Sequence, residues 1–475
     1  MIWNISWKNV WRNKARSLVV VCAVTLGTIS GVFVAGMMNG WVDQRIRSAV
    51  YTEVSHIKIQ NPKYLINEEL KHTIPNITEI SDFLNNSDKV SAWTKHTKII
   101  AMASTSRGST ALNLKGINVD EEIQVSNVKD FIVDNGGDYF ESGFKNPIVI
   151  SEKTADQLRL INYIISQELL DSITDLGADA NLISSLSSIK NKRFITEKKF
   201  KAQLESILKP NDIKELGAQI MKLAKNYKVR SKIVFTFSGM NGEMSYQSFR
   251  VCGIYKTNNA MFDQMNAFVK EENIATVAGF MPNDYHEISI ILKDDKENLT
   301  SFKDELSSKF PNTSVMTWKE LAPDAGMMAD FMKIYYYIIM GVIFFALAFG
   351  IINTMLMAVL ERIKELGMLM AVGMNKKRVF SMIMLETIFL TLVGSIVGML
   401  LGGALIVIFG KIGMNFASVQ EGFEAFGWSA MVYPSIDLSF FLGVTIMVII
   451  IAILSSVIPA RKALKLNPVE AIRTE

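Results

Sequence analysis

The sequence predicts a polytopic α-helical membrane protein with four transmembrane helices and a large α+β extracytoplasmic domain between helices 1 and 2. Three observations predict this fold class: four long apolar stretches, Lys and Arg gathered between alternate stretches, and short strand-like segments after the first stretch. The chain has 475 residues, of which 49% are hydrophobic, and a net charge of +4. This composition fits a membrane protein with a sizeable aqueous part, and the small charge gives no reason to expect a nucleic acid partner.

Residues 1–16 are predicted to form a cytoplasmic amphipathic helix. Trp3, Trp7 and Trp11 recur every four residues, so a helix places the three indoles on one face at the level of the lipid headgroups. Packing of this stripe inside a protein core is the alternative. The cations of the segment, which contains no acid, are Lys8, Arg12, Lys14 and Arg16.

The four apolar stretches are long enough to span a bilayer. Residues 17–42 carry no charge and are too long for a signal-peptide core of roughly 7–15 residues, so they predict a retained helix. Lys333 and Glu361 are separated by 27 uncharged residues, whereas about 20 suffice to cross. We therefore predict transmembrane helices over 17–42, 331–360, 379–410 and 438–460, with Pro459 at the exit of the last.

The positions of Lys and Arg predict the orientation. Residues 1–16, 361–378 and 460–475 hold four, five and four of these cations, whereas the 411–437 loop holds one. Because cytoplasmic segments are enriched in Lys and Arg, both termini are predicted to be cytoplasmic. The remaining segments are then an extracytoplasmic domain at 43–330, a short outer loop at 411–437 and a cytoplasmic tail at 461–475.

The extracytoplasmic domain is predicted to mix strands and helices. Between residues 160 and 226 long polar–apolar runs replace the strand pattern, with Pro210 as the main breaker, and we interpret this part as a helical insertion of open role. Elsewhere, strand-like runs such as SHIKIQ (55–60), PIVIS (147–151) and EISIILK (287–293) alternate with helical patterns at 78–86, 152–161 and 297–309.

Glycines at helical spacing offer packing surfaces in two of the membrane helices. Gly394, Gly398 and Gly402 recur every four residues in the third helix, and Gly27 and Gly31 do so in the first. In lipid such ridges let helix backbones approach closely, although glycine as helix filler is the alternative.

Glu386 is the only formal charge in the predicted third helix. It lies eight residues after Arg378, about 12 Å along a helix. A proton or ion relay needs several such groups, so pairing with a neighbouring subunit or with the basic 361–378 segment is the favoured interpretation, and its role stays open.

The segment 361–378, called the elbow below, is predicted to be a cytoplasmic coupling helix between helices 2 and 3. If it continues as helix to Met374, Ile363, Leu366, Leu369 and Met370 line one face. Such a face suits docking into a protein groove. The alternative is a helix lying on the bilayer, with the basic residues 376–378 facing lipid headgroups.

The residues around the elbow resemble a known family. The order N-x-x-x-x-x-V-x-E-R-x-x-E-x-G-x-x-x-A-x-G is similar to the second transmembrane helix and coupling helix of FtsX/MacB/LolC-type ABC permeases. The stretch 458–475 is similar to the P-A-x-x-A-x-x-x-x-P-x-E-A-x-R finish of that family, and 9–17 resembles its amphipathic entry. The elbow motif is carried by Asn353, Val359, Glu361, Arg362, Glu365, Gly367, Ala371 and Gly373.

This resemblance implies the permease subunit of an ABC complex that works by mechanotransmission. Such proteins are dimers flanked by two ATPases, whose nucleotide cycle moves the outer domains rather than opening a wide aqueous channel. An ABC ATPase and a second permease subunit, identical or different, are therefore the expected partners besides membrane lipid. The residues expected to meet the ATPase are Glu361, Arg362, Glu365, Gly367, Ala371 and Gly373.

No catalytic or cofactor site is predicted. The sequence contains no G-x-x-x-x-G-K-[ST] motif, so ATP is expected to bind to a separate subunit. The four histidines are scattered, and His286-Glu287 lacks the second His of a zinc-binding H-E-x-x-H helix. Cys22 and Cys252 cannot make a disulfide framework. We therefore expect a non-catalytic subunit with no metal or cofactor of its own.

The stretches GMMNGW (36–41), SHIKIQNPKY (55–64) and FRVCGIYKTNN (249–259) resemble lipoprotein-releasing LolC/LolE permeases. This resemblance implies ATP-driven release of lipoproteins from a bacterial inner membrane toward the outer membrane, with a periplasmic outer domain. The alternatives are export of amphiphilic compounds or peptides, as in MacB, and FtsX-like signalling to an envelope hydrolase. The sequence leaves open the substrate, the ATPase and the choice between homodimer and heterodimer.

Overall fold

The computed structural model describes residues 2–12, 14–141, 143–175, 178–416, 420–425, 427–436 and 438–464. The chain forms two compact units. A membrane unit contains Met1–Ile46, Met327–Gln420 and Ser429–Glu475, and a large domain contains Arg47–Gly326 together with Glu421–Trp428. The part of the predicted tail that follows residue 464 lies outside the described residues.

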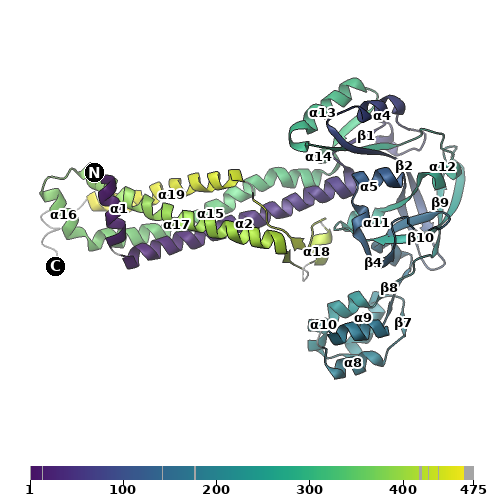
Figure 1. The fold of residues 1–475 in the computed structure, drawn as a ribbon, viewed down its shortest axis with the longest axis horizontal. Helices are drawn as coiled ribbons and strands as arrows, with labels where there is room; N and C mark the ends of the chain where they lie inside the picture. The colour runs from purple at the N-terminus through teal and green to yellow at the C-terminus, as the bar shows by residue number, and fades with distance from the viewer. Residues whose placement is uncertain are drawn as a thin grey trace. The chain divides into compact units, whose positions relative to one another are not determined.

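Four helices are long and apolar enough to cross a membrane (Figure 1), and in the sequence the large domain lies between the first and the second of them. The predicted fold class is therefore confirmed. The four helices are Ser17–Val54, Pro323–Glu361, Lys376–Ile412 and Phe440–Leu464. The elements of the membrane unit are α1 (Ile2–Arg12), α2 (Lys14–Ser48), α15 (Pro323–Glu361), α16 (Ile363–Ala371), α17 (Lys376–Ile412), β14 (Met414–Asn415), β15 (Met431–Val432) and α19 (Leu438–Leu464).

These helices extend beyond the predicted apolar stretches because local signals, rather than hydrophobicity, decide where a helix ends. α17 begins where the Asn375 side chain accepts a hydrogen bond from the Lys377 N–H at 3.0 Å, and it ends at Gly413, whose φ is +77°. α19 continues through Pro459, the predicted exit, as far as Leu464.

α1 is shorter than the predicted segment 1–16 and packs on the third membrane helix. The rings of Trp3 and Trp7 lie on one face and contact Phe389 of α17, with centroid distances of 4.9 and 5.4 Å. The same indoles remain 63% and 43% exposed. The stripe therefore combines the two alternatives, since one side is packed and the other is open.

The large domain contains two sheets that share one long strand, β2 (Val90–Ser104). The first half of β2 belongs to an antiparallel sheet of order β13-β1-β12-β2, and α4 and α13 bury residues such as Ile80 and Phe302 against it. This βαββαβ order is ferredoxin-like. The bounds are β1 (Ile57–Gln60), α4 (Ile77–Asn85), β12 (Glu287–Leu292), α13 (Asp295–Lys309) and β13 (Ser314–Thr317).

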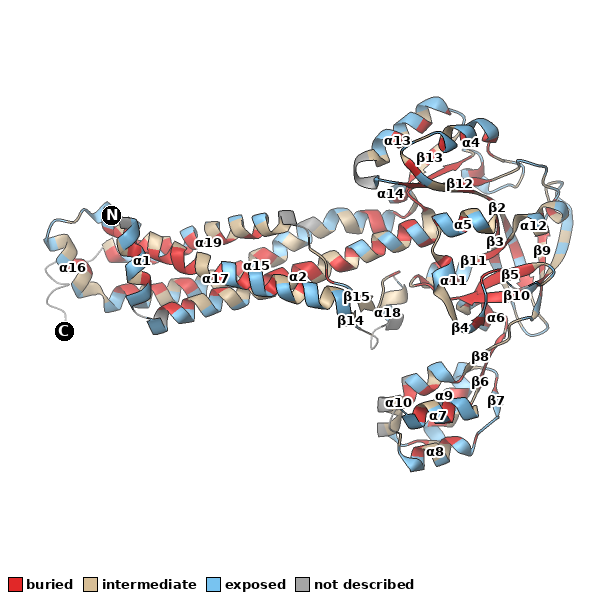
Figure 2. Ribbon diagram, viewed as in Figure 1, coloured by how far each residue is buried: buried red, intermediate tan, exposed pale blue. Residues whose placement is uncertain are grey.

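The second half of β2 belongs to a closed ring of six strands, called the barrel below. β2 pairs with β3, β3 with β11, β11 with β5, β5 with β10, β10 with β9, and β9 again with β2. Leu114, Ile150, Phe235 and Phe249 fill its interior, and Figure 2 shows these strands largely buried. The bounds are β3 (Ser109–Ile117), β5 (Pro147–Ser151), β9 (Lys232–Ser238), β10 (Met244–Tyr255) and β11 (Asn266–Lys270), with β4 (Ile132–Gly137) paired to β10.

The predicted helical insertion is a small subdomain that also contains a three-stranded sheet of order β7-β6-β8. The predicted helix 152–161 is wrong at its end: α6 stops at Gln157, Arg159 has a φ of +57°, and β6 starts at Ile161. A four-residue apolar run such as Ile161–Ile164 has no periodicity that separates strand from helix. The bounds are β6 (Ile161–Ile164), α7 (Gln167–Asp175), α8 (Ala180–Ser187), β7 (Arg193–Phe194), α9 (Glu197–Ile207), α10 (Pro210–Leu223) and β8 (Lys225–Tyr227).

Short elements complete the large domain, including one from the loop between the third and fourth membrane helices. In that loop Glu424 of α18 lies 3.1 Å from Nζ of Lys256, which follows β10. The short elements are η1 (Ala49–Val54), α3 (Tyr64–Asn67), α5 (Val119–Val125), η2 (Val128–Phe131), α6 (Glu152–Gln157), α11 (Ala260–Met265), α12 (Glu271–Ala278), α14 (Trp318–Leu321) and α18 (Gln420–Ala425).

Candidate functional site: the elbow

The elbow consists of one short helix bounded by two backbone breaks. α15 ends at Glu361, and Arg362 leaves the helical conformation with a φ of −103° before α16 begins at Ile363. After α16, Gly373 has a φ of +98°, a conformation that side chains with a Cβ rarely adopt. The chain can therefore reverse direction within a few residues and enter α17.

Two ion pairs fix the first turn of the elbow. Nη1 of Arg362 donates to both carboxylate oxygens of Glu386 in α17, at 3.1 and 3.3 Å, and Nε donates to Glu365 at 3.0 Å. Arg12 of α1 makes a further hydrogen bond to Glu365. Arg362 and Glu386 are 18% and 9% exposed, so their pairing is shielded from water, whereas Arg12 is 56% exposed.

The neighbouring arginines shift the pKa of the Glu365 carboxylate. Burial alone would raise its pKa, but the hydrogen bonds from Arg12 and Arg362 hold the pKa of Glu365 below its ordinary value. Glu365 therefore stays ionised and links α1 to the elbow. Of the two pairings that the sequence left open for Glu386, the structure shows the one with the elbow.

The apolar face of the elbow does not face outward, which corrects one expectation. Leu366 is 2% exposed and Gly367 is buried, while Leu369 and Met370 pack against the same cluster, which includes Val359 of α15 and residues of α17 and α19. The predicted docking face is therefore used inside the membrane unit. Burial of apolar side chains against the chain's own helices decides this orientation of α16.

The opposite side of the elbow is exposed and is called the tip below. It carries Met368 and Val372, which are 61% and 85% exposed, together with the exposed Ala371 and Gly373. A Cβ at Gly373 would meet no heavy atom within 4 Å. Residues Met368 and Val372 were not among the predicted site residues, because the helical pattern alone does not say which face packs inward.

The six predicted coupling residues thus divide into two groups. Arg362, Glu365 and Gly367 hold the elbow in place, while Glu361, Ala371 and Gly373 lie at its surface. A cleft of about 310 Å³ lies beside the ion pairs. Residues of α1, α2, α15, the elbow and α17 line it, among them Asn9, Arg12, Glu361, Arg362, Glu365 and Glu386.

The predicted glycine ridges lie where membrane helices approach one another. A Cβ at Gly398 would lie 2.7 Å from Cβ of Thr28 and 2.8 Å from the carbonyl oxygen of Thr25, both in α2. Gly394 and Gly402 face α2 in the same way, at Val21 and Val32. Gly27 and Gly31 face Leu347 and Met340 of α15. α2 therefore packs between α17 and α15, with the glycines of α17 against one of its sides and its own Gly27 and Gly31 against α15.

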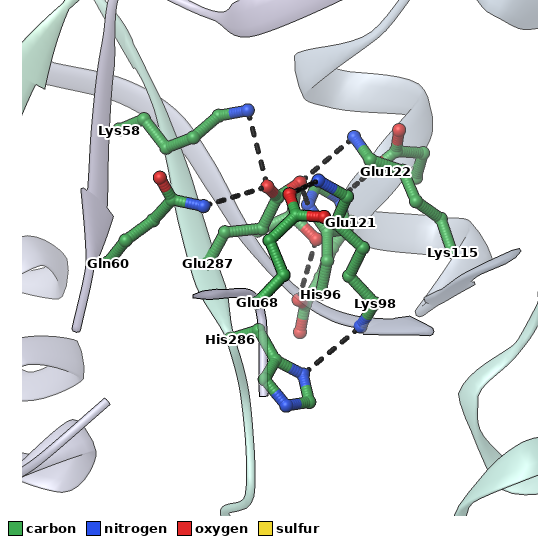
Figure 3. Close-up of polar contacts among 11 residues, drawn as sticks. Lys58, Gln60, Glu68, His96, Lys98, Lys115, Glu121, Glu122, His286 and Glu287 are labelled. Carbon is green, nitrogen blue, oxygen red and sulfur yellow. Dashed lines mark hydrogen bonds and ion pairs between the residues drawn. The ribbon is translucent and has the colours of Figure 1, made fainter. Parts of the chain in front are cut away.

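The large domain contains a second polar cluster, which the sequence analysis did not find. Glu287 lies at its centre, 3.0 Å from Nζ of Lys115, 3.3 Å from Nζ of Lys58 and 3.1 Å from Nδ1 of His96 (Figure 3). Nε2 of His96 lies 2.6 Å from Glu122 of α5. All five residues are at most 8% exposed. Because Lys58 and Glu287 belong to the ferredoxin-like sheet and Lys115 to the barrel, this ionic cluster joins the two sheets.

The charges in this cluster shift one another's pKa values. Burial alone would raise the pKa of Glu287, but Lys115 and Lys58 hold it well below its ordinary value. Burial alone would lower the pKa of His96, but Glu122 holds it above 6.5. The sequence contained one indication of this cluster, because Lys58 and Glu287 are charged residues in otherwise apolar strands. However, charged residues in a strand are explained equally well if their side chains face the solvent.

Comparison with known proteins identifies part of the chain. Residues 337–468 match the family model described as FtsX-like permease C-terminal. An uncharacterized ABC transporter permease of Methanocaldococcus jannaschii is 28% identical over 235 residues, which cover 48% of this chain and 56% of the relative. The macrolide export ATP-binding/permease protein MacB of Campylobacter fetus is 34% identical over 124 residues, 26% of this chain and 17% of the relative. The chain thus spans about half or less of the length of these relatives.

Two solved structures are also similar to parts of this chain. The extracellular domain of the ABC-type transporter YknZ from Gram-positive bacteria is 14% identical, with a TM-score of 0.29, over 55% of this chain and 99% of that one. The periplasmic region of MacB from Actinobacillus actinomycetemcomitans is 11% identical, with a TM-score of 0.28, over 58% of this chain and 94% of that one. TM-scores this low do not define a common fold.

Four membrane-length helices, an ion-paired elbow between the second and third, and a large domain after the first define a polytopic membrane protein. Within it, residues 337–468 match an FtsX-like permease domain, and relatives of the chain are named ABC transporter permease and MacB. The resemblance to the FtsX/MacB type is therefore confirmed.

Proposed function

We propose that this chain is the non-catalytic membrane subunit of an ATP-driven transporter, and that a separate ATPase subunit binds the ATP and moves the chain by its elbow. The main support for this proposal is the exposed tip of the elbow. Met368 and Val372 are exposed on a helix whose other side is anchored by Leu366 and by the Arg362–Glu386 pair. An exposed apolar pair on a fixed support suits a protein contact that transmits force.

The second membrane helix supports the mechanical part of the proposal. α15 is continuous over 39 residues, from Pro323 to Glu361, which corresponds to about 58 Å. It starts beside the large domain in the sequence and ends at the elbow. A helix without a break transmits a displacement along its axis rather than absorbing it, so movement of the tip would reach the large domain.

The complex is proposed to contain two permease subunits flanked by ATPases, with the elbow and both termini on the cytoplasmic side and the large domain outside. The excess of Lys and Arg in residues 1–16 and 361–378 supports this orientation. The FtsX-like permease domain supports an ABC-type ATPase as the partner. Localisation in a bacterial inner membrane belongs to the same proposal.

For the substrate, two classes of amphiphile have comparable support. Relatives named macrolide export proteins favour an amphiphilic compound or peptide. The stretches similar to LolC/LolE permeases favour a lipoprotein. FtsX-like signalling to an envelope hydrolase is the third possibility. Mass spectrometry of what copurifies with the chain separates them: acylated proteins support lipoprotein release, and a hydrolase supports signalling. Depletion of the chain that leaves outer-membrane lipoproteins correctly sorted rules out lipoprotein release.

The elbow assignment is tested by the double variant Met368→Glu/Val372→Asp in membranes. We expect loss of the copurifying ATPase and of ATP-dependent turnover, while the amount of folded permease stays unchanged. The matched control is Met261→Glu/Met281→Asp, which places the same charges on side chains of the large domain that are 68% and 75% exposed. Retention of the ATPase by the tip variant, or its equal loss from the control, rejects the assignment.

A further inference from the structure

Six cations gather at one end of the barrel without a carboxylate partner. No ion pair joins any of them to an acid within the described part of the chain. By contrast, three buried or half-buried lysines of the large domain are paired: Lys115 with Glu287, Lys225 with Glu152 and Lys256 with Glu424. The six, all exposed or half-exposed, are Arg107, Lys145, Lys228, Arg230, Lys232 and Arg250.

Strand register and hydrogen bonds bring these cations together. Lys232 of β9 stands opposite Arg250 of β10, and Nη1 of Arg250 donates to the carbonyl oxygen of Arg230 at 3.3 Å. The guanidinium of Arg230 lies 5.7 Å from the ring centre of Phe144. The backbone N–H of Arg250 also donates to the carbonyl oxygen of Asn146, which follows Lys145. Like charges held this close repel one another, so a bound anionic group would relieve an unfavourable field.

Lys228 and Arg107 add positive charge to the same end of the barrel. The pKa of Lys228 is lowered, first by burial and then by the charges of Arg107 and Arg193. Arg107 lies in the turn between β2 and β3, and Ser104 at the end of β2 stands opposite Val234, two residues from Lys232. The turn therefore lies at the basic end of β9.

An apolar row continues from the basic end along the outer face of the same strands. Tyr246 of β10 stands opposite Thr236 of β9, which stands opposite Met102 of β2. Tyr246 and Met102 are 77% and 49% exposed, and Met244 and Ile100, two residues further along their strands, are 70% and 55% exposed. Arg250 lies six positions after Met244, which corresponds to about 20 Å of strand. We call this surface, from Met244 to Arg250 with its neighbours on β9 and β2, the strip.

The composition of the strip matches a protein contact better than a surface that only meets water. Tyr, Met and Arg are among the residue types enriched in protein–protein interfaces, and the few residues that dominate the binding energy are enriched in Trp, Tyr and Arg. Exposed apolar residues in a contiguous group mark interaction sites on soluble domains. The barrel interior is already filled by Phe235 and Phe249, so the outward residues are not needed for its core.

We propose that the strip is a docking surface for an acidic polypeptide segment, in which carboxylates meet the unpaired cations and apolar side chains cover Tyr246 and Met102. Charge complementarity selects an acidic partner and disfavours a second copy of the strip, because two such surfaces would bring their cations together. This contact lies on the large domain and does not depend on the elbow or on ATP.

Photocrosslinking of the full chain in its native membrane tests the proposal. p-Benzoylphenylalanine replaces Tyr246, and the crosslinked segment is identified by mass spectrometry. We expect a polypeptide whose crosslinked segment is net negative. We also expect the yield to fall about tenfold or more when Arg230, Lys232 and Arg250 are all changed to Glu, because like charges across an interface are strongly unfavourable. Changing acidic residues of the captured segment to Lys then restores the crosslink to the charge-reversed chain.

Two controls make the result specific. The triple variant Lys198→Glu/Lys199→Glu/Lys201→Glu applies the same charge change to exposed lysines of α9 and should leave the yield within twofold. p-Benzoylphenylalanine at Met281, an exposed position outside the strip, should not capture the same segment. Crosslinking to a second copy of this chain or to phospholipid, or capture that the charge reversal leaves unchanged, overturns the proposal.

Discussion

Arg362 in the elbow donates two hydrogen bonds from Nη1 to the carboxylate of Glu386 in α17, at 3.1 and 3.3 Å, although Glu386 lies 24 positions later in the sequence. The elbow is thereby tied to the helix that follows it as well as to the helix that precedes it. A force on the tip would act on α15 and α17 together. The first prediction therefore concerns the stability that the Arg362–Glu386 pair contributes.

Breaking the Arg362–Glu386 pair should destabilise the membrane unit. Arg362→Ala leaves Glu386 buried without its partner, so we expect the free energy of unfolding to fall by about 3–5 kcal/mol. Replacing both residues, as Arg362→Met/Glu386→Leu, should cost less than either single change, because no uncompensated charge remains. Equilibrium unfolding in detergent micelles measures each difference.

The control for this experiment is Arg12→Ala. Arg12 is 56% exposed and its pair with Glu365 is open to water, so we expect a change of at most about 1 kcal/mol. If Arg12→Ala and Arg362→Ala cost the same, burial of the Arg362–Glu386 pair does not explain its contribution.

Gly373→Ala should strain the end of the elbow without any steric clash. A Cβ there would meet no atom within 4 Å, but the φ of +98° is unfavourable for alanine, and we expect a loss of about 1–2 kcal/mol. Gly350→Ala is the control, since that glycine also has open space but lies inside α15, where alanine is the better helix former. Unfolding in the same detergent compares them, and equal effects would argue against backbone strain.

Gly398→Ala should separate α17 from α2. The added Cβ would lie 2.7 Å from Cβ of Thr28, closer than van der Waals contact, so we expect a loss of about 1–3 kcal/mol from overpacking. Gly403→Ala, whose Cβ would lie 3.6 Å from the ring of Phe441, should be nearly neutral. Disulfide crosslinking rates between cysteines introduced into α2 and α17 provide a second readout, and unchanged rates for Gly398→Ala would contradict close packing at this ridge.

The buried cluster around Glu287 should give the large domain a stability maximum in mildly acidic solution. The folded-state pKa of Glu287 lies below its ordinary value of 4.5, so its stabilisation is present above that pH and is lost on acidification. The folded-state pKa of His96 lies above 6.5, so its stabilisation is present below 6.5 and is lost as the pH rises through the folded-state value. We therefore expect maximal protection between about pH 4.5 and 6.5.

Hydrogen exchange of peptides from β2 and β12 in the full chain measures this protection. His96→Gln should remove the decline above pH 6.5 and leave the decline in acid, whereas His72→Gln, a substitution at a histidine outside the cluster, should change neither. Protection of the unmodified chain that is constant from pH 5 to 8 would contradict the role assigned to His96.

The sequence alone predicted the four membrane helices, because hydrophobicity is a local property of a segment. It also determined the strand-like runs of the large domain and the motif at the elbow. Local patterns could not predict the three-stranded sheet of the subdomain, because the sequence of Ile161–Ile164 is equally compatible with a strand and a helix.

Only the tertiary structure decided which side of the elbow is free. The pattern of Ile363, Leu366, Leu369 and Met370 describes an apolar face, but whether that face meets a partner or the chain's own helices depends on residues as distant as Val359 and α19. In the same way, the pairing of Glu386 with Arg362, the closure of the barrel and the ionic cluster at Glu287 arise between segments far apart in the sequence. Burial, which removes water from a charge or an apolar surface, is a property of the assembled packing, and no single segment carries it.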